Sequence, residues 1–507
     1  MRRIVAVAGS DWHHHVSAPR PLTQVRLPEA AAARSGVIKL APLDHKSVDT
    51  TFRALTPSSG EGITRPHLTK QMSDALEQRL AAETVELCAQ LIRFDTTNYG
   101  DGRSHGERVA ADWVAATLAA DGYQPTVVEA APGRASTVVR IPGVDRTAPG
   151  LLVHGHLDVV PAEAADWSVD PFGGELRDGA IWGRGALDMK AMDAMMLAVA
   201  RSWARAEYRP PRDIVLAFVA DEEDNGDLGA RYLVRNRPEL FAGVTTAIGE
   251  SGGYSVHLPD GSVLYPIATA ERGTARIKLT AQGPAGHGSR RNPGNAVAAL
   301  ARTVARLADH RWPIHPTPTV QALLDGLAAH LGTRIDPADL TPLGEAARLV
   351  ENTLSNSLNP TMLSAGYKVN VVPSEAVAWL DGRLLPGAAD DFFATVESLL
   401  EPGVRYEVPT YTAPVASGHE TAEFAAMADA IRAHDPDGLV LPFCMTGGTD
   451  AKAFAELGIA GYGFAPGRWP ADFEHWGYVH GVDEHVPIES LAFGANVLDT
   501  YLRREIS

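Results

Sequence analysis

Two histidines and an aspartate alternate at the end of an apolar stretch, in the segment LLVHGHLDVVPA of residues 151–162. Because side chains in an extended strand repeat every second residue, His154, His156 and Asp158 should lie on one face. A neutral imidazole is the commonest metal ligand, and a nearby carboxylate can hold its other ring nitrogen. We therefore expect His156 to bind a metal and Asp158 to orient it, and we assign His154 a supporting or structural role.

Acidic residues follow further apolar stretches. Asp188 comes after a glycine-rich turn in GRGALDMKAMDA, where on its own it could equally cap the helix that follows. The segment FVADEEDNGDLGA carries five acids between Asp221 and Asp227. Such a charge run is usually solvated, but this one begins directly after a strand that looks buried. Two metal ions there would compensate the repulsion between the adjacent carboxylates. Of its adjacent glutamates, one (Glu223) can bind metal while the other (Glu222) stays free to take a proton from water.

Two more candidates stand near strand ends. Glu250 ends a strand in AIGESGG and enters a glycine-rich turn, although alone it could be a solvated loop acid. The segment HWGYVHGVDEHVP offers His475, His480 and His485. We favour His480 as the ligand because a glycine and two acids follow it, and we place the other two at the surface or behind the site.

The combined set of histidine and carboxylate ligands indicates two divalent cations. Three carboxylates, from Asp188, Glu223 and Glu250, would neutralise all but one of the positive charges of the two cations. The remaining positive charge suits a bound hydroxide. Ligands without thiolates suit zinc, with cobalt or manganese as alternatives. Coordination lowers the pKa of water from ~15.7 toward ~7, and a two-metal site can also polarise a carbonyl. We expect Glu222 to be the general base and later to protonate the leaving nitrogen.

The segments that carry these residues alternate between expected strands and helices. Strands are expected at TVVEA, STVVRIP, LLVHGH, DIVLAFVADEE and VTTAIGE, with helices over Met189 to Arg205 and in GARYLVRNRPELF. Apolar strands separated by helices indicate an α/β sheet covered on both faces. Ligands in such sheets gather beyond the carboxyl ends of the strands. We therefore predict an α/β fold with a mixed, mostly parallel sheet flanked by helices.

The pattern of apolar and polar residues changes near Glu271, and this change predicts a second domain. RGTARIKLTAQG alternates as a half-buried strand does, and further amphipathic strands and two helices follow. We predict that residues 268–411 form an inserted, smaller α+β domain, which includes a Pro-rich helical insert over about 311–354. Residues 73–267 and 412–507 would together form a discontinuous catalytic domain.

The chain is expected to become ordered near Ser73. Ser73 is a plausible N-cap of a helix that runs to about Arg93, with Leu76, Leu80, Leu87 and Leu91 on one face. Residues 1–72 show no sustained periodicity, so we predict a poorly ordered extension. We assign the histidine triplet of residues 13–15 to this extension rather than to a metal site.

The composition excludes several classes of partner and site. With 507 residues the chain is too long for one core. A net charge of −17 argues against nucleic acid or an anionic membrane as the main partner. The only cysteines, Cys88 and Cys444, rule out a disulfide scaffold and a Cys-rich zinc site. No stretch approaches the roughly 20 apolar residues that span a bilayer, and the N-terminal apolar run is shorter than a secretory signal requires. We expect a cytoplasmic protein.

Eight motifs stand in an order that resembles one superfamily. They are HGHLDVVPA, GRGALDMKAMDA, ADEEDNGDLGA, GES, GPAGHGS, NVVPSEA…DGR, GGTDAKAF and HGVDEHVP. The superfamily is that of zinc aminoacylase, glutamate carboxypeptidase, acetylornithine deacetylase and succinyl-diaminopimelate desuccinylase. The resemblance covers about residues 75–507, and FDTTN and the long insert are most similar to the yeast carboxypeptidase S branch. Ala191 departs from the pattern, since the family usually has glycine there.

The resemblance implies a zinc-exopeptidase-like catalytic domain and a role for each site residue. Asp188 would bridge two zinc ions, with Glu223 and His480 completing one site and His156 and Glu250 the other. Asp158 would support His156, and Glu222 would be the base.

The resemblance also implies that the inserted domain is a lid through which the chain forms a homodimer. His287 would stabilise the oxyanion, often in the active site of the partner subunit. Asn370 and Arg383 would contact substrate from the lid, and Gly448 and Thr449 would line a carboxylate pocket. Arg383 could equally anchor a structural ion pair.

We therefore expect a dinuclear zinc hydrolase that cleaves an amide bond adjacent to a free carboxylate, in an N-acyl amino acid or a short peptide. The alternative within enzymes is a biosynthetic deacylase of the acetylornithine deacetylase or succinyl-diaminopimelate desuccinylase type. A non-catalytic ligand-binding homologue is a third reading, which the presence of the base and all ligands disfavours.

Overall fold

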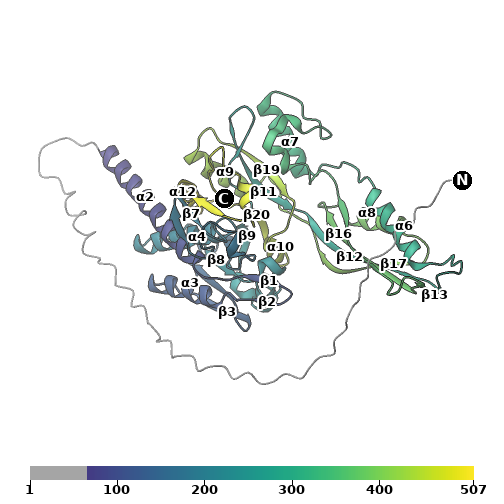
Figure 1. Cartoon of the computed structure of the whole chain (residues 1–507). Helices are drawn as coiled ribbons and strands as arrows, with labels where there is room; N and C mark the ends of the chain where they lie inside the picture. The colour runs from purple at the N-terminus through teal and green to yellow at the C-terminus, as the bar shows by residue number, and fades with distance from the viewer. Residues whose placement is uncertain (1–64, 507) are drawn as a thin grey trace, which may run out of the picture. The chain divides into compact units, whose positions relative to one another are not determined.

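A computed structural model describes residues 65–506 of the chain (Figure 1). Residues 1–64, with the histidine triplet at 13–15, lie outside the described residues. The first helix described, α2, spans Arg65–Ile92, so its predicted start at Ser73 is wrong and residues 65–72 are helical. Pro66 lies in the first turn of this helix, where a proline is tolerated because its missing N–H would have no helical partner.

The main sheet is mixed, as predicted. It has ten strands, with β10-β11-β20-β9-β5-β8-β4-β3 in order and β18 and β19 paired to β11. Its strands are β3 (Thr126–Ala131), β4 (Arg134–Ile141), β5 (Gly150–His156), β8 (Ile214–Val219), β9 (Val244–Gly249), β10 (Val256–His257), β11 (Val263–Glu271), β18 (Val415–Ala416), β19 (Leu439–Met445) and β20 (Ala460–Gly463). The central run β20-β9-β5-β8 is parallel, whereas β4 and β3 join it antiparallel.

Helices cover both faces of this sheet. The helices α2, α3 (Arg108–Ala120), α4 (Lys190–Arg205), α9 (Ala422–His434) and α12 (Ile488–Leu502) share a core with Leu151 and Val153 of β5. The helices α5 (Ala230–Asn236) and α10 (Ala451–Ala455) share the opposite core with Leu152. This two-sided burial explains why β5 is apolar at successive positions rather than alternating. None of the helices between residues 65 and 506 is long and apolar enough to cross a membrane.

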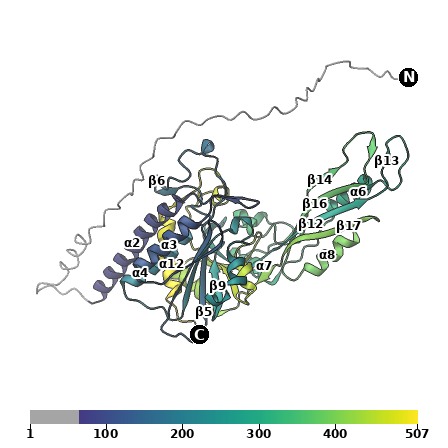
Figure 2. The ribbon, with the colours of Figure 1, turned by 90° about the horizontal axis from the view of Figure 1, so that it is seen from below.

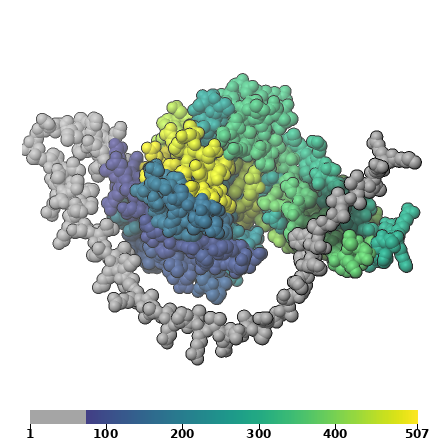
Figure 3. All heavy atoms as spheres, in the orientation of Figure 1, coloured from purple at the N-terminus to yellow at the C-terminus, as the bar shows by residue number. Residues whose placement is uncertain are grey.

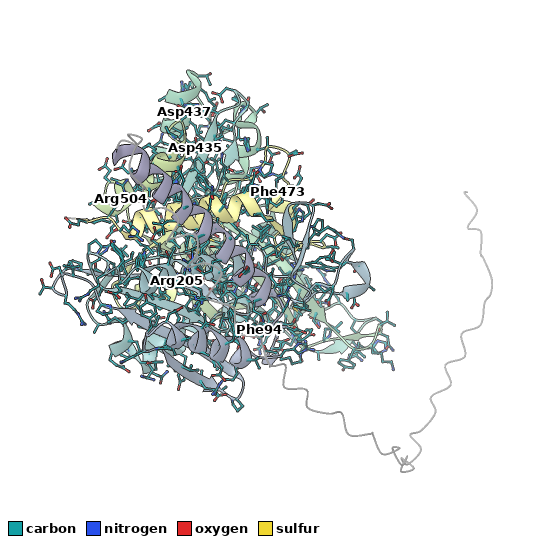
Figure 4. All side chains as sticks on the ribbon, turned by 90° about the vertical axis from the view of Figure 1, so that its left-hand side faces the viewer. Phe94, Arg205, Asp435, Asp437, Phe473 and Arg504 are labelled. Atoms are coloured by element: carbon teal, nitrogen blue, oxygen red, sulfur yellow. The ribbon has the colours of Figure 1, made fainter. Side chains whose placement is uncertain are left out.

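Segments that are distant in the sequence lie side by side in this part of the molecule. Figure 4 shows α2 (purple) crossing over the yellow α12, which packs against it. On the face seen in Figure 3, C-terminal residues (yellow) lie between N-terminal segments (purple to blue) and the middle of the chain (green). The C-terminal residues therefore complete the structure that the first half of the described chain begins.

A second sheet is antiparallel throughout and has the strand order β14-β16-β12-β17 (Figure 2). Its strands are β12 (Gly273–Gln282), β14 (Ser357–Ala365), β16 (Glu375–Leu384) and β17 (Val404–Thr412). Strand β16 alternates between buried and partly buried residues, and its buried side packs with α6 (Ala296–Asp309) and α8 (Ala389–Ser398). This is the α+β arrangement that the sequence predicted.

The Pro-rich insert packs on the main sheet. Helix α7 (Pro318–Leu331) and the 3-10 segment η4 (Thr341–Leu349) share a core with β11 and β19 (Figure 1). Leu323 and Leu327 of α7 lie in that core with Leu264 and Phe443. The predicted boundary at residue 268 also falls inside β11. The division into a catalytic and a lid domain stays a prediction, and the sequence could not show on which sheet an amphipathic helix would pack.

Three small sheets and several short helices complete the described fold. The small sheets pair β1 (Asn98–Gly100) with β2 (Arg103–Ser104), β13 (Gly286–His287) with β15 (Val371–Val372), and β7 (Ala180–Trp182) with both β6 (Glu175–Arg177) and β21 (His485–Pro487). The short helices are η1 (Ala164–Asp166), η2 (Glu222–Asp224), η3 (Pro238–Phe241) and α11 (His475–Tyr478).

Candidate active site

The candidate residues meet at one edge of the main sheet. His156 is the last residue of β5, Glu250 directly follows β9, and Glu222 lies in η2, three residues after β8 ends. These three strands are parallel, so their carboxyl ends share one edge. These residues therefore meet at the carboxyl ends of the parallel strands, where the sequence predicted them.

Asp188 lies between two histidines. Its Oδ1 is 2.9 Å from Nε2 of His156, and its Oδ2 is 3.1 Å from Nε2 of His480. A Glu223 oxygen, Oε1, is 3.2 Å from the same His480 nitrogen, and Oε2 of Glu250 is 3.8 Å from Nε2 of His156. One carboxylate therefore faces two imidazoles, and each imidazole has a further glutamate beside it.

Two sets of ligand atoms in this cluster are close enough to hold a metal ion. One set is His156, Asp188 and Glu223, and the other is His156, Glu222 and Glu250; within each, the atoms lie within 4.8 Å of one another. All five predicted ligands and the predicted base therefore converge.

The electrostatics of the cluster favour positive charge. Burial raises the pKa of Glu222, and the neighbouring Glu250 carboxylate adds to the shift. Hydrogen bonds with Asp188 and Glu223 raise the pKa of His480 to about 10. Burial acts to lower the pKa of His156, but the hydrogen bond with Asp188 and the surrounding carboxylates raise it well above its usual value. A cluster that stabilises charge on two imidazoles suits divalent cations with nitrogen and oxygen ligands.

Asp158 contacts the site differently from our expectation. Nδ1 of His156 is 2.9 Å from the backbone oxygen of Asp158 and 3.7 Å from its carboxylate. The carboxylate instead accepts the backbone N–H groups of Glu222 (3.1 Å) and Glu223 (3.2 Å), together with the Asn98 amide (2.9 Å). Asp158 therefore fixes the backbone that carries both glutamates, while its carbonyl orients the imidazole.

Glu484 supports Asp188, which sequence reasoning did not foresee. This buried carboxylate accepts the backbone N–H groups of Leu187 (2.7 Å) and Asp188 (3.1 Å) and pairs with Arg184 at 2.6 Å. Strands β7 and β21 pair beside it, which joins the Asp188 turn to the His480 segment. The available signal was Arg184 inside a glycine-rich turn, a position where an unpaired charge would be costly.

A second buried network, also missed, fixes the turn after β8. Asp221 has a left-handed backbone (φ 68°) and contacts Arg134 at 2.7 Å. Arg134 also pairs with the buried Glu107 at 2.8 Å. Arg134 opens the apolar strand β4, where an arginine needs a partner.

His154 does not join the cluster. Its buried ring packs against Phe454, with ring centroids 5.1 Å apart. Burial lowers the pKa of His154 to about 3, so this imidazole is neutral near neutral pH. Its packing fits the structural role assigned to it.

A cavity of about 720 Å³ opens above the cluster. Its lining includes Asp188, Glu222, Glu223, Glu250 and His480 from the cluster, and Arg383, Gly448 and Thr449 of the predicted substrate contacts. The Thr449 hydroxyl donates to buried Glu271 at 2.7 Å. Arg383 pairs with Asp381, with Nε 2.8 Å from Oδ1, so the structure shows the ion pair that the sequence left open.

His287 and Asn370 lie outside this cavity. Both are exposed, and His287 in β13 pairs with Val371 of β15. In Figure 1, β13 lies at the end of the second sheet that is farther from the main sheet. These two predicted substrate contacts therefore do not reach the cluster of their own chain in this structure.

The chain belongs to peptidase family M20/M25/M40, whose profile matches residues 152–504. It is 27% identical over 477 residues to N-fatty-acyl-amino acid synthase/hydrolase PM20D1 from Homo sapiens, covering 87% of this chain and 90% of that protein. It is 29% identical over 352 residues to aminoacylase-1 from Sus scrofa, covering 67% of this chain and 77% of that protein.

Among solved structures, the fold is similar to an M20 family metallo-carboxypeptidase, Sso-CP2, from Sulfolobus solfataricus. The TM-score is 0.61 at 18% identity, covering 83% of this chain and 98% of that one. The resemblance stated from the motifs is confirmed, and the chain is an amide hydrolase of this family.

Proposed function

We propose that this chain is a dinuclear metal hydrolase that cleaves an amide bond next to a free carboxylate, in an N-acyl amino acid or a short peptide. The observation that carries the proposal is the position of Asp188 between His156 and His480 on the floor of the cavity. The names of the relatives, an aminoacylase and an N-fatty-acyl-amino acid synthase/hydrolase, support the same reaction class.

The cluster would hold two metal ions. His156 and Glu250 would bind one, Glu223 and His480 the other, and Asp188 would be shared by both. Imidazole and carboxylate ligands suit zinc, with cobalt or manganese as alternatives. When bound, such ions supply positive charge that acidifies water and polarises a carbonyl.

The protein residues would position the substrate and move the proton. Glu222 would accept a proton from water and return it to the leaving nitrogen, for which a carboxyl with a raised pKa is suited. Arg383 would bind the substrate carboxylate, with Gly448 and Thr449 beside it. Asp381 holds Arg383 in place for this task.

A second copy of the chain would complete the site, as the lid resemblance implies. Strand β14 is an edge of the second sheet and exposes Met362 (66%) and Leu363 (59%). An exposed apolar edge strand is normally paired or covered. Pairing with a second copy would cover it and could deliver His287 to the partner's cavity. The cytoplasmic location stays a prediction.

The proposal is tested by metal analysis together with a substrate panel. Elemental analysis of the purified protein should give two metal ions per chain. Hydrolysis of N-acyl amino acids and dipeptides should stop on chelation and return when zinc is added back. Hydrolysis that survives complete metal removal would contradict the proposal.

A further inference from the structure

One wall of the cavity is cationic. Four side chains contribute to it: Arg231, Arg276, Arg383 and Lys452. The carboxylate cluster lines the same cavity, so a substrate held at the cluster shares this space with the four cations. Arg383 would bind the carboxylate next to the scissile amide, which leaves three cations of the wall without an assigned ligand.

Two of these arginines lie on one face of the second sheet. In the register of β12 and β16, Thr274 pairs with Arg383, and Arg276 pairs with Asp381. Arg276 and Arg383 are therefore diagonal neighbours, and such neighbours lie roughly 7–8 Å apart. Ala275, which lies between Thr274 and Arg276 on β12, is buried in the core on the opposite face. The two arginines therefore share the face that lines the cavity.

Arg231 approaches the same part of the second sheet from α5. Its Nε donates to the Asn225 carbonyl at 2.9 Å, and its Nη2 donates to the Thr412 hydroxyl at 3.1 Å. Thr412 is two residues from Thr410, the register partner of Arg276 on β12. Both acceptors of Arg231 are uncharged oxygens, and this guanidinium forms no ion pair within residues 65–506.

The carboxylates that pair with this wall are fewer than its cations. Asp381 serves both Arg276 and Arg383. Among the described residues, the only other ion pair of the wall joins Lys452 to Glu271 at 3.9 Å. Burial lowers the pKa of Lys452, and the charge of Arg383 acts in the same direction. Two carboxylates thus face four cations, and the wall carries a surplus of positive charge.

Two further acids line the cavity without pairing with this wall. Neither Asp224 nor Asp450 forms an ion pair with any of the four cations in the part of the chain that the structure describes. Burial raises the pKa of Asp450 to about 7, so this carboxyl is only partly ionised near neutral pH. The surplus charge of the wall is therefore left for a ligand.

We propose that Arg231 and Arg276 form an anion subsite, which selects substrates that carry a second carboxylate besides the one next to the scissile amide. The inference rests on the proposed function and names its substrate class. The second carboxylate is either an acidic side chain of the released amino acid or a carboxylate on the acyl group. In both cases it gains charge-assisted hydrogen bonds, above all from Arg231, which has no carboxylate partner among the described residues.

The experiment measures kcat/KM of the metal-loaded full chain on matched pairs of an acid and its amide. One pair is N-acetylglutamate and N-acetylglutamine, and the other is N-succinylalanine and N-succinamoylalanine. Within each pair only the charge of one group changes. Hydrogen bonds between charged groups predict a preference of at least about 10-fold for the acid in one pair or both. Added salt should reduce this preference, because it screens partly exposed charges.

The two pairs distinguish the sources of the second carboxylate. A preference in the glutamate pair places the subsite against the amino-acid side chain, and a preference in the succinyl pair places it against the acyl group. Ratios near one in both pairs, or hydrolysis of other N-acyl amino acids but of neither acid, overturn the inference and leave the proposed function intact. If no N-acyl amino acid or dipeptide is hydrolysed, the proposed function itself fails.

Variants test whether these arginines make the selection. Arg231→Gln and Arg276→Gln should each lower the acid-to-amide ratio by at least about fivefold, whereas Arg231→Lys keeps the positive charge and should retain part of the preference. Arg235→Gln is the control, because Arg235 lies one turn further along α5, is exposed and does not line the cavity; it should keep the wild-type ratio. Thermal unfolding identifies a variant that fails to fold. Unchanged ratios in folded Arg231→Gln and Arg276→Gln would overturn the inference.

Discussion

Glu222 differs from Asp188, Glu223 and Glu250, which each lie within 4 Å of an imidazole nitrogen, because no such ion pair is found for it within residues 65–506. Its neighbours are Glu250, Glu223 and Asp450, whose charges all oppose its ionisation, with His156 as the counterweight. Because burial and these carboxylates raise its pKa, Glu222 is suited to accept a proton and to return it.

Replacing Glu222 by Gln should therefore remove the proton acceptor and keep the shape of the site. We expect kcat to fall by about 10²- to 10⁴-fold, the usual contribution of a general base, with metal content and unfolding temperature unchanged. The matched control is Asp227→Asn, because Asp227 belongs to the same acidic run but is exposed. A Glu222→Gln enzyme that retains more than a tenth of wild-type kcat would rule out the assigned role.

Asp158 gives a second prediction at the same scale. Its carboxylate accepts two backbone N–H groups and one amide N–H. In Asp158→Asn, one of these donors would face an NH₂ group. We expect metal affinity to fall about 10- to 100-fold, as is typical for residues that orient ligands, measured by competition with a chromophoric chelator. Asp166→Asn, at an exposed position in η1, should bind metal as the wild type does, and equal affinities of the two variants would contradict this role.

The sequence predicted the cluster well because each ligand follows an apolar strand or a glycine-rich turn, and parallel strands end at a common edge. It could not predict the partners of these residues. Arg134 meets Asp221 across 87 residues, and Arg184 meets Glu484 across 300 residues. Such pairs cannot be predicted from the spacing of residues along the chain, because they depend on how the strands assemble into the sheet.

At the scale of elements, α2 shows how position along a helix decides burial. The sequence placed Leu76, Leu80, Leu87 and Leu91 on one apolar face. Leu80, Leu87 and Leu91 are buried, whereas Leu76 in the same helix is 59% exposed. Figure 1 shows the first turns of α2 extending past α4 and α12.

The two ends of this face should differ sharply in their contribution to stability. Leu91 is fully buried, so Leu91→Ala should lower the free energy of unfolding by about 2–5 kcal/mol, which combines lost burial and a cavity. Leu76→Ala makes the same chemical change on the exposed turn and should stay within roughly 0.5 kcal/mol of wild type. Denaturant unfolding of both variants provides the measurement, and similar values would show that α2 does not pack as described.

The insert shows a different limit of sequence reasoning. The sequence predicted a Pro-rich helical insert over about residues 311–354, and the structure contains α7 there. The sheet that receives this face was not predictable, because strands β11 and β19 and the second sheet both offer apolar surfaces. The helical content of residues 311–354 was therefore anticipated, whereas the strands on which they pack were not.

At the scale of the whole molecule, the distance between His287 and its own cluster makes a prediction about assembly. If His287 acts in the partner subunit, His287→Ala should lose activity alone. Co-expression with Glu222→Gln should then restore about a quarter of wild-type activity, because half of the random dimers are mixed and each has one complete site.

Two controls make the complementation decisive. Mixing the separately purified variants without subunit exchange should restore nothing, and sedimentation should show a dimer that Leu363→Glu on the edge strand weakens. If the co-expressed mixed dimers show no recovery, His287 either acts within its own chain or has no role.

The connections between the two sheets limit how far one sheet can rotate against the other. In the described chain the backbone crosses between them four times: from β11 to β12, from α6 to α7, from η4 to β14 and from β17 to β18. Arg272, in the crossing from β11 to β12, donates through its guanidinium to Asn352 and Ser357 of the crossing from η4 to β14, and to the Arg383 carbonyl on β16. A hinge needs only a few residues that absorb the backbone change, whereas four crossings, two of them joined by Arg272, resist rotation of one sheet against the other. The second sheet therefore cannot be excised as an independent domain, because removing it would also remove α7 and η4, which pack on the main sheet.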